Sequence, residues 1–363
     1  MGSDRGRLVR RVLRSEWERL IRIHPSNRPW QMPFAAALAT GLPLVIGAYF
    51  DRMDHGMVAS LGGLVFLYLP ATPLYHRMVT LMACAFGMSA CFTLGVISHF
   101  HAPAMMPTLA LTTILVTMVC KLYGIGPPGS LFFVMATAIG AYTPTPVEDL
   151  PTKVGLITLG TLLASLIAFF YSLHVLRKSP PRPVMPLPAP TFDVVIFDSV
   201  VIGVFVGISL ALAQLLQLER AYWVPVACLA VIQGTTLRAV WDRQLHRVLG
   251  TGVGLLLAWA VLLVPMDPWS AALTMMVLTF VVETAIVRHY AFAAAFITAL
   301  TILLAEIPTL GQTPVGFLIE ARFFDTVLGC AVGLLGGACL HSARFRAVAG
   351  RELRRLVPSR FKR

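Results

Sequence analysis

Two stretches of this chain, TPLYHRMVTLMACAFG (Thr72–Gly87) and VWDRQLHRVLGTGVG (Val240–Gly254), carry the same His-Arg pair within long apolar sequence, 170 positions apart. A second pair of stretches repeats the pattern near the end of each half. TKVGLITLGTLLASL (Thr152–Leu166) is echoed 169 positions later by ARFFDTVLGCAVGLL (Ala321–Leu335). Because the two offsets agree, the sequence predicts an internal repeat that divides the chain into halves.

The composition indicates a membrane protein. Of the 363 residues, 57% are hydrophobic and 13% are charged, and the mean hydropathy is +0.78, whereas soluble chains carry roughly 25% charge. The six cysteines lie in apolar runs without CxxC spacing, so we interpret them as small side chains of the membrane core and expect no metal or cofactor. No nucleophile motif or nucleotide-binding loop is present, so we expect neither an enzyme nor ATP-driven transport.

The apolar stretches predict an all-α polytopic membrane protein with about twelve transmembrane helices in two parallel six-helix repeats, residues 31–176 and 194–343. The predicted spans are 32–50, 56–70, 77–99, 104–121, 129–143 and 154–176 in the first repeat, and 196–217, 222–236, 244–264, 268–287, 290–305 and 320–342 in the second.

The distribution of positive charge predicts the orientation. With these spans, 25 of the 29 Lys and Arg residues fall on one side, which marks the cytoplasm. Both termini and a proline-rich linker (177–193) are then cytoplasmic, so the two repeats run parallel. Residues 1–30 form a basic segment whose stretch 8–23 is amphipathic and suited to an anionic lipid surface, and residues 344–363 form a basic tail. Orientation and lipid contact account for the net charge of +12, so no nucleic-acid partner is expected.

The second and fifth spans of each half are short, or interrupted by Gly or Pro, as at Gly62-Gly63, Pro127-Pro128 and Pro225. Short or broken spans at matching places in two halves point to a central solute site, since transporters place the substrate path between their repeats. The alternative is that they are ordinary short packing helices.

Ionisable residues at membrane depth provide candidates for substrate binding or proton coupling. Arg243 and Arg247 share a helix face, with Asp242 as a nearby acidic partner, and a pair of guanidinium groups suits a carboxylate. Alternatively, their charge only sets the orientation. Arg322 and Asp325, spaced i and i+3, can pair on one face.

Glu283 and Asp325 lie among apolar residues and could carry a proton, although Asp325 with Arg322 could also be a purely structural pair. Arg288 is a further charged candidate in this half. The first half offers Arg77 and Lys121 at similar places, but no carboxylate that matches Asp325.

Aromatic and small residues complete the set of candidates. Tyr222-Trp223 and His289-Tyr290 open two spans, where they either belong to the interfacial belt or stack on a flat organic solute. Gly250 with Gly254, and Gly329 with Gly333, form small faces that let helices approach closely.

Three stretches resemble the fusaric acid resistance protein family, also called the aromatic acid exporter family. They are YWVPVACLAVIQGTTLRAVWDRQLHRVLGTGVG (Tyr222–Gly254), VRHYAFAAAFIT (Val287–Thr298) and RFFDTVLGCAVG (Arg322–Gly333). The match is strong over about 220–340 and weaker over 30–175, where it rests on the repeat. The motif residues carried over are Tyr222, Trp223, Gln233, Arg247, Gly250, Thr251, Arg322, Asp325 and Thr326.

The resemblance implies a bacterial inner-membrane protein that exports aromatic carboxylic acids or similar organic anions, driven by protons and working with a periplasmic adaptor protein. A distant similarity to the plant malate channel family implies a homodimer. Our leading hypothesis is a secondary exporter in which the arginines hold the carboxylate. The alternatives are a passive organic-anion channel of the same shape and a non-transporting membrane scaffold within an envelope assembly.

Overall fold

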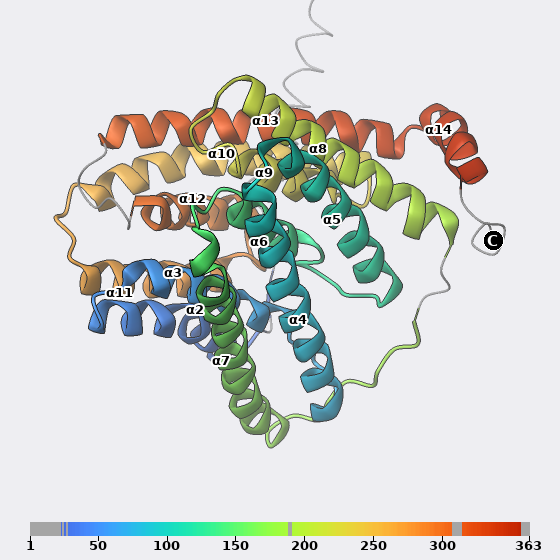
Figure 1. The fold of residues 1–363 in the computed structure, drawn as a ribbon. Coiled ribbons are helices and arrows are strands. Elements are labelled where there is room, and N and C mark those ends of the chain that lie inside the picture. The colour runs from blue at the N-terminus through green and yellow to red at the C-terminus, as the bar shows by residue number, and fades with distance from the viewer. Residues whose placement is uncertain (1–22, 24, 27, 188–190, 307–313, 357–363) are drawn as a thin grey trace, which may run out of the picture.

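The computed structural model describes residues 23, 25–26, 28–187, 191–306 and 314–356. All regular structure in these ranges is helical, which confirms the predicted all-α class (Figure 1). The first half contains α2 (Gln31–Tyr49), α3 (Met53–Gly63), the 3-10 helix η1 (Leu64–Tyr68), α4 (Leu74–His99), α5 (Ala102–Leu122), α6 (Leu131–Ala141), the 3-10 helix η2 (Val147–Asp149) and α7 (Leu150–Leu176).

The second half begins within the predicted linker, because the Thr191 side chain accepts a hydrogen bond from the Val194 amide and starts a helix there. The predicted basic tail also contains a helix, whereas the predicted amphipathic stretch 8–23 lies almost wholly outside the described residues. The elements are the π-helix η3 (Phe192–Phe197), α8 (Asp198–Leu215), α9 (Trp223–Ile232), α10 (Leu237–Leu262), α11 (Pro268–Ala285), α12 (Tyr290–Glu306), α13 (Val315–His341) and α14 (Ala343–Leu356).

Eight of the described helices are long and apolar enough to cross a membrane, namely α2, α4, α5, α7, α8, α10, α11 and α13. Large apolar side chains on their outer faces are exposed, as Phe86 on α4 and Leu256 on α10 are, which suits contact with lipid. The chain is therefore a multi-pass membrane protein. The count of twelve spans and the sidedness of the termini stay predictions.

The helices at the four positions where short spans were expected are indeed short. α3, α6 and α9 have 11, 11 and 10 residues, and α12 has 17. At about 1.5 Å per residue, α9 covers roughly half of a bilayer core of about 30 Å. Every residue of α9 is buried. Protein thus surrounds this helix and satisfies the requirement that a short helix be shielded from lipid.

Corresponding helices make corresponding contacts in the two halves. α4 packs on α6 and α7, as α10 packs on α12 and α13, and α3 packs on α7 as α9 packs on α13. Gly160 of α7 lies against the backbone of Ala59, and Gly329 of α13 lies against the backbone of Val224. The long helices nevertheless run in different directions, with α10 and α13 across Figure 1 and α4 and α7 downward. The internal repeat stays a prediction.

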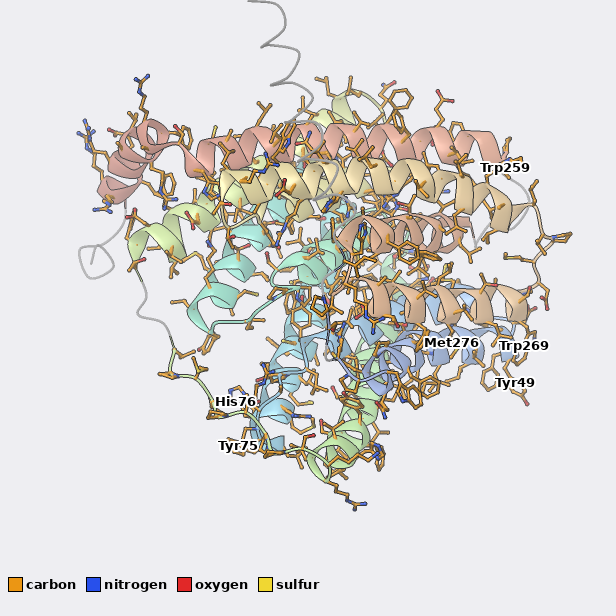
Figure 2. The ribbon with its side chains drawn as sticks, turned by 180° about the vertical axis from the view of Figure 1, so that it is seen from behind. Tyr49, Tyr75, His76, Trp259, Trp269 and Met276 are labelled. Carbon is orange, nitrogen blue, oxygen red and sulfur yellow. The ribbon has the colours of Figure 1, made fainter. Side chains whose placement is uncertain are left out.

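The halves are joined by an exchange of helices: α2 packs on α11, and α5 packs on α8. The Tyr49 ring at the end of α2 meets the Trp269 ring at the start of α11, with centroids 6.4 Å apart, and Met276 fills the space beside Gly41 (Figure 2). The end of one helix lies beside the start of the other, so α2 and α11 run antiparallel.

In each of these two helix pairs, α2–α11 and α5–α8, an ion pair joins the two halves at one end of the pair. Arg28, just before α2, places Nη1 3.2 Å from Oε2 of Glu283 near the end of α11. Lys121 at the end of α5 places Nζ 2.8 Å from Oδ2 of Asp198 at the start of α8, and Asp198 also pairs with Arg346 of α14. The two cross-half pairs occupy equivalent places with the charges reversed.

We expect Arg28→Glu to lower the free energy of unfolding by about 3 kcal/mol, because it leaves the buried Glu283 carboxylate facing a like charge. The double variant Arg28→Glu, Glu283→Arg should recover most of the loss. The thermal midpoint of the protein in detergent measures both effects. Arg52→Glu is the control, since the pair of Arg52 with Asp54 is exposed and contributes little. Equal losses in Arg28→Glu and in the double variant would contradict the assignment.

We also expect Gly160→Val to destabilise the fold, whereas Gly155→Val on the same helix should not. A Cβ at position 160 would collide with the backbone carbonyl of Ala59, while a Cβ at position 155 meets nothing within 4 Å. Overpacking of this kind costs about 1–3 kcal/mol. Both variants carry the same change in helix propensity, so the difference between their thermal midpoints isolates the collision, and equal midpoints would refute it.

Candidate functional site

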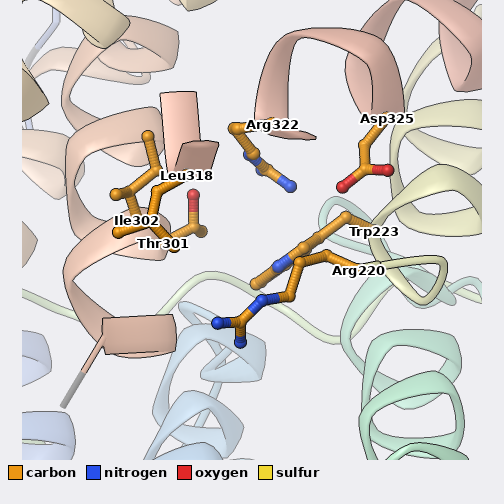
Figure 3. A pocket seen from close by; sticks show the side chains of 7 residues that line it. All are labelled: Arg220, Trp223, Thr301, Ile302, Leu318, Arg322 and Asp325. Atoms are coloured by element: carbon orange, nitrogen blue, oxygen red, sulfur yellow. The ribbon is translucent and has the colours of Figure 1, made fainter. Parts of the chain in front are cut away.

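A pocket lies inside the second half, between the N-terminal part of α13, α12 and the start of α9. It has an empty volume of about 250 Å³ including its open mouth, but the space that a whole water molecule can enter is much smaller. In Figure 3, Arg322 and Asp325 of α13 point toward the indole of Trp223, and Arg220 lies on the other side of that ring. The lining residues are Arg220, Trp223, Thr301, Ile302, Leu318, Arg322 and Asp325.

Arg322 is a buried guanidinium that protein acceptors do not satisfy. Its side chain is 5% exposed, and its Nε and Nη1 have no hydrogen-bond partner among the described residues. The guanidinium carbon lies 4.3 Å from the centroid of the Trp223 ring. This cation–π contact orients the group and supplies about 2 kcal/mol where water is excluded, but it leaves the N–H donors open to an anion.

Asp325 is the matching unsatisfied carboxylate. It is 1% exposed, and neither of its oxygens accepts a hydrogen bond from any described part of the chain. Arg322 and Asp325 share one face of α13 and are electrostatic neighbours, as their spacing predicted. No hydrogen bond joins them in this structure, in which the face of the guanidinium lies over Trp223. Both charges remain available to a solute or a proton.

Arg247 is the second buried arginine of this half. Its Nη1 donates to the Tyr290 hydroxyl at 3.4 Å, and its Nε has no partner within the described ranges. It is an electrostatic neighbour of Arg322, and the Cys330 thiol is a neighbour of both guanidinium groups. The packing of α10 on α13 thus brings together two arginines that are 75 positions apart in sequence.

Arg243 does not join this group. It is half-buried, and Asp242 pairs with Arg238 at 3.1 Å rather than with Arg243 or Arg247. The physical reason is helical geometry, because Arg238 and Asp242 are separated by four residues and lie on one face of α10.

The start of α12 holds a group of rings beside Arg247. The centroids of His246 and His289 are 6.0 Å apart, and Tyr290 lies 6.3 Å from His246. The His289 ring also accepts a hydrogen bond from the Phe292 amide, which caps the helix. Arg288 is exposed.

The aromatic residues at the start of α9 pack against side chains of other helices. Trp223 is buried, and the Tyr222 ring lies 5.2 Å from it and 5.8 Å from Tyr142 of α6. Gln233 at the other end of α9 donates to the Ser130 hydroxyl at 2.8 Å. Trp223 positions Arg322, whereas Tyr222 and Gln233 hold the second half against the first.

Three charged candidates have partners elsewhere. Glu283 and Lys121 form the cross-half ion pairs described above. Arg77 donates from Nε to the Thr72 carbonyl at 2.6 Å and from Nη1 to the Ser172 hydroxyl at 3.3 Å. These contacts assign the three residues to holding helices together, outside the pocket.

The small residues of the motif allow the close packing that builds the site. Gly250 and Gly254 lie against the backbone of α12, and Gly329 and Gly333 lie against that of α9. The Thr326 hydroxyl bonds to the Arg322 carbonyl at 2.9 Å, and Thr251 accepts from Thr298 of α12 at 3.4 Å.

Four lining residues are not among the candidates from the sequence, namely the polar Arg220 and Thr301 and the apolar Ile302 and Leu318. With the predicted spans, Arg220 is one of the four Lys and Arg residues on the side opposite the other 25, and the scarcity of positive charge there is the available signal. Thr301 carries no sequence signal of its own, since threonines are frequent in apolar helices.

Comparison with known proteins supports the resemblance seen in the motifs. Residues 200–336 match the family described as fusaric acid resistance protein-like. The chain is also similar to the uncharacterized membrane protein YvaC of Bacillus subtilis (strain 168), with 22% identity over 87% of this chain and 73% of that protein. No solved structure matches the chain.

The matched range contains α9 to α12, most of α8 and most of α13, and with them the pocket, Arg247 and Cys330. The segment of this membrane protein that builds the candidate site, residues 200–336, is thus a fusaric acid resistance protein-like region, as its motifs indicated.

Proposed function

We propose that this protein is a secondary membrane transporter that exports aromatic carboxylates or related organic anions, coupled to protons. The observation that carries the proposal is the buried Arg322, whose Nε and Nη1 lack an acceptor among the described residues. An unpaired buried charge is costly, and in membrane proteins such charges mark solute or proton paths. A carboxylate would supply an acceptor for one of these two donors and bind the neighbouring Nη2 with its second oxygen, in the bidentate geometry that guanidinium groups favour.

The pocket in this structure is too small to hold an organic solute, because the space open to whole water molecules is far below the volume of a ligand pocket. Ligand pockets commonly measure roughly 300–1,000 Å³, and this one is smaller even with its mouth included. Apolar side chains, Ile302 and Leu318, face the charged ones across it. A single aromatic ring with one carboxylate suits this arrangement once the long Arg220 or Arg322 side chain moves aside.

Asp325 is the proposed proton carrier. While ionised beside the pocket, its carboxylate repels an incoming anion; when protonated, it becomes neutral and donates a hydrogen bond. Anion binding and protonation of Asp325 are therefore linked, each favouring the other. A proton and an anion that bind together also cross together, so by this route the anion leaves down its own concentration gradient and carries a proton with it.

A passive organic-anion channel is the second candidate, favoured by the same linkage. Protons and anions that bind together do not by themselves produce exchange in opposite directions. A membrane potential that is negative inside already drives anions outward, by about 2.3 kcal/mol per charge at 100 mV. In this alternative Arg322 and Arg247 attract the anion, and the potential supplies the driving force.

The proposed setting is the bacterial inner membrane, with both termini in the cytoplasm and the chain forming a homodimer that works with a periplasmic adaptor protein. The charge asymmetry of the sequence supports the orientation, and the family resemblance supports the other features.

Reconstituted vesicles test the proposal. We expect uptake of labelled benzenesulfonate, a permanently charged aromatic anion that cannot cross bilayers as a neutral acid, and expect Arg322→Gln to lower its rate at least tenfold. Lys153→Gln, at the position aligned with Arg322 in the first half, should leave the rate within twofold. Absence of uptake by the unmodified protein would favour the scaffold alternative and overturn the proposal.

Separate gradients distinguish the transporter from the channel. With the potential clamped by potassium and valinomycin, a pH gradient alone should drive accumulation by a proton-coupled transporter, and Asp325→Asn should abolish that response. A channel should respond to a potassium diffusion potential alone and ignore the pH gradient. Vesicles without protein provide the baseline.

A further inference from the structure

The two aligned arginines, Arg77 and Arg247, have different environments although both are buried. Protein groups satisfy Arg77, which binds the Thr72 carbonyl and the Ser172 hydroxyl. Arg247 has one long hydrogen bond, to Tyr290, and an Nε without a partner in the described part of the chain. Arg77 therefore holds helices of the first half together, whereas Arg247 has an Nε donor that can bind a solute.

Among the described residues, polar groups at the seam between the halves form contacts that join one half to the other. One apolar cluster crosses the seam, with Leu109 and Val134 of the first half packed with Val206 and Val224 of the second. The ion pairs at the ends of α2–α11 and α5–α8 and the bond from Gln233 to Ser130 use polar groups at the seam for attachment. An anion moving along the seam would have to break these contacts.

The buried charged groups with unsatisfied hydrogen-bonding atoms lie near one another within the second half. Arg322 and Asp325 lie at the pocket, and Arg247 lies near enough to Arg322 for electrostatic interaction. Cys330, two helical turns along α13 from Arg322, is a neighbour of both guanidinium groups. These side chains come from α10 and α13, which pack together beside α12.

We infer that the anion path runs inside the second half, from the pocket at Arg322 and Asp325 past Cys330 to Arg247, with the first half acting as its support. This inference rests on the proposed function, because it locates the path of the anion that the protein is proposed to move. It departs from the expectation that the path lies between the two repeats. Arg322 and Arg247 act in sequence, each receiving the anion as the other releases it.

The native thiols test the path without relying on transport. In reconstituted protein carrying a single cysteine, the anionic reagent 2-sulfonatoethyl methanethiosulfonate should modify Cys330 at least tenfold faster than Cys91, a buried thiol of the first half. Benzenesulfonate should slow the modification of Cys330. A cysteine introduced at Ala138, in the apolar seam cluster, should react as slowly as Cys91. Faster reaction at Ala138→Cys than at Cys330, or no reaction at Cys330, would overturn the inference.

The aligned arginines provide the functional test. Arg247→Gln should lower the rate of benzenesulfonate uptake at least tenfold per folded protein, with the thermal midpoint nearly unchanged. Arg77→Gln should lower the thermal midpoint, because it removes a buried brace, and should leave uptake per folded protein within twofold. Equal loss of uptake per folded protein in both variants would show that the first half contributes to transport as much as the second, which would refute the inference while leaving the proposed function intact. Absence of uptake by the unmodified protein would instead refute the proposed function.

Discussion

The exchange of helices between the halves is the constraint on which the rest of the structure depends. α2 belongs to the first half but packs on α11 of the second, and α5 packs on α8. Each pair is closed by an ion pair between opposite halves, Arg28 with Glu283 and Lys121 with Asp198. Neither half forms a closed helix bundle by itself, because the first helix of each half packs against a helix of the other half. The seam must therefore be well packed, and it is poorly suited to a hydrated passage.

Enclosure of the short helices follows from the same packing. α9 is too short to cross a bilayer, and all its residues are buried among α6, α8, α10 and α13. Its first residue, Trp223, can then present its ring to Arg322 away from lipid and bulk water. A guanidinium in such a place interacts strongly with an anion, because the surroundings screen charge far less than water does. The short helix thus helps to provide the low-dielectric environment in which Arg322 would interact strongly with an anion.

Much of the candidate site could be predicted, but not how its members use their charges. The sequence motifs and the position of these residues within apolar stretches predicted that Arg322, Asp325 and Arg247 are buried, and the structure confirms their burial. The spacing of Arg322 and Asp325 predicted that they are neighbours, but it could not predict the cation–π contact of Arg322 with Trp223, which is distant in sequence, or the lack of a hydrogen bond between the two charges. Glu283 looked like an isolated acid, because Arg28 lies 255 positions away. Partners supplied by other helices cannot be read from local spacing.

The sequence by itself determined the membrane class, the helical fold, the short helices and the resemblance of the second half, because apolar length, charge and small-residue motifs are local properties. Only the tertiary structure decided which charges are satisfied. Arg77 and Arg247 occupy aligned positions, yet the first is held by Thr72 and Ser172 and the second is left with an open Nε. The partners that folding places beside a buried charge decide whether that charge holds helices together or can bind a solute. Those partners come from helices that are far away in the sequence.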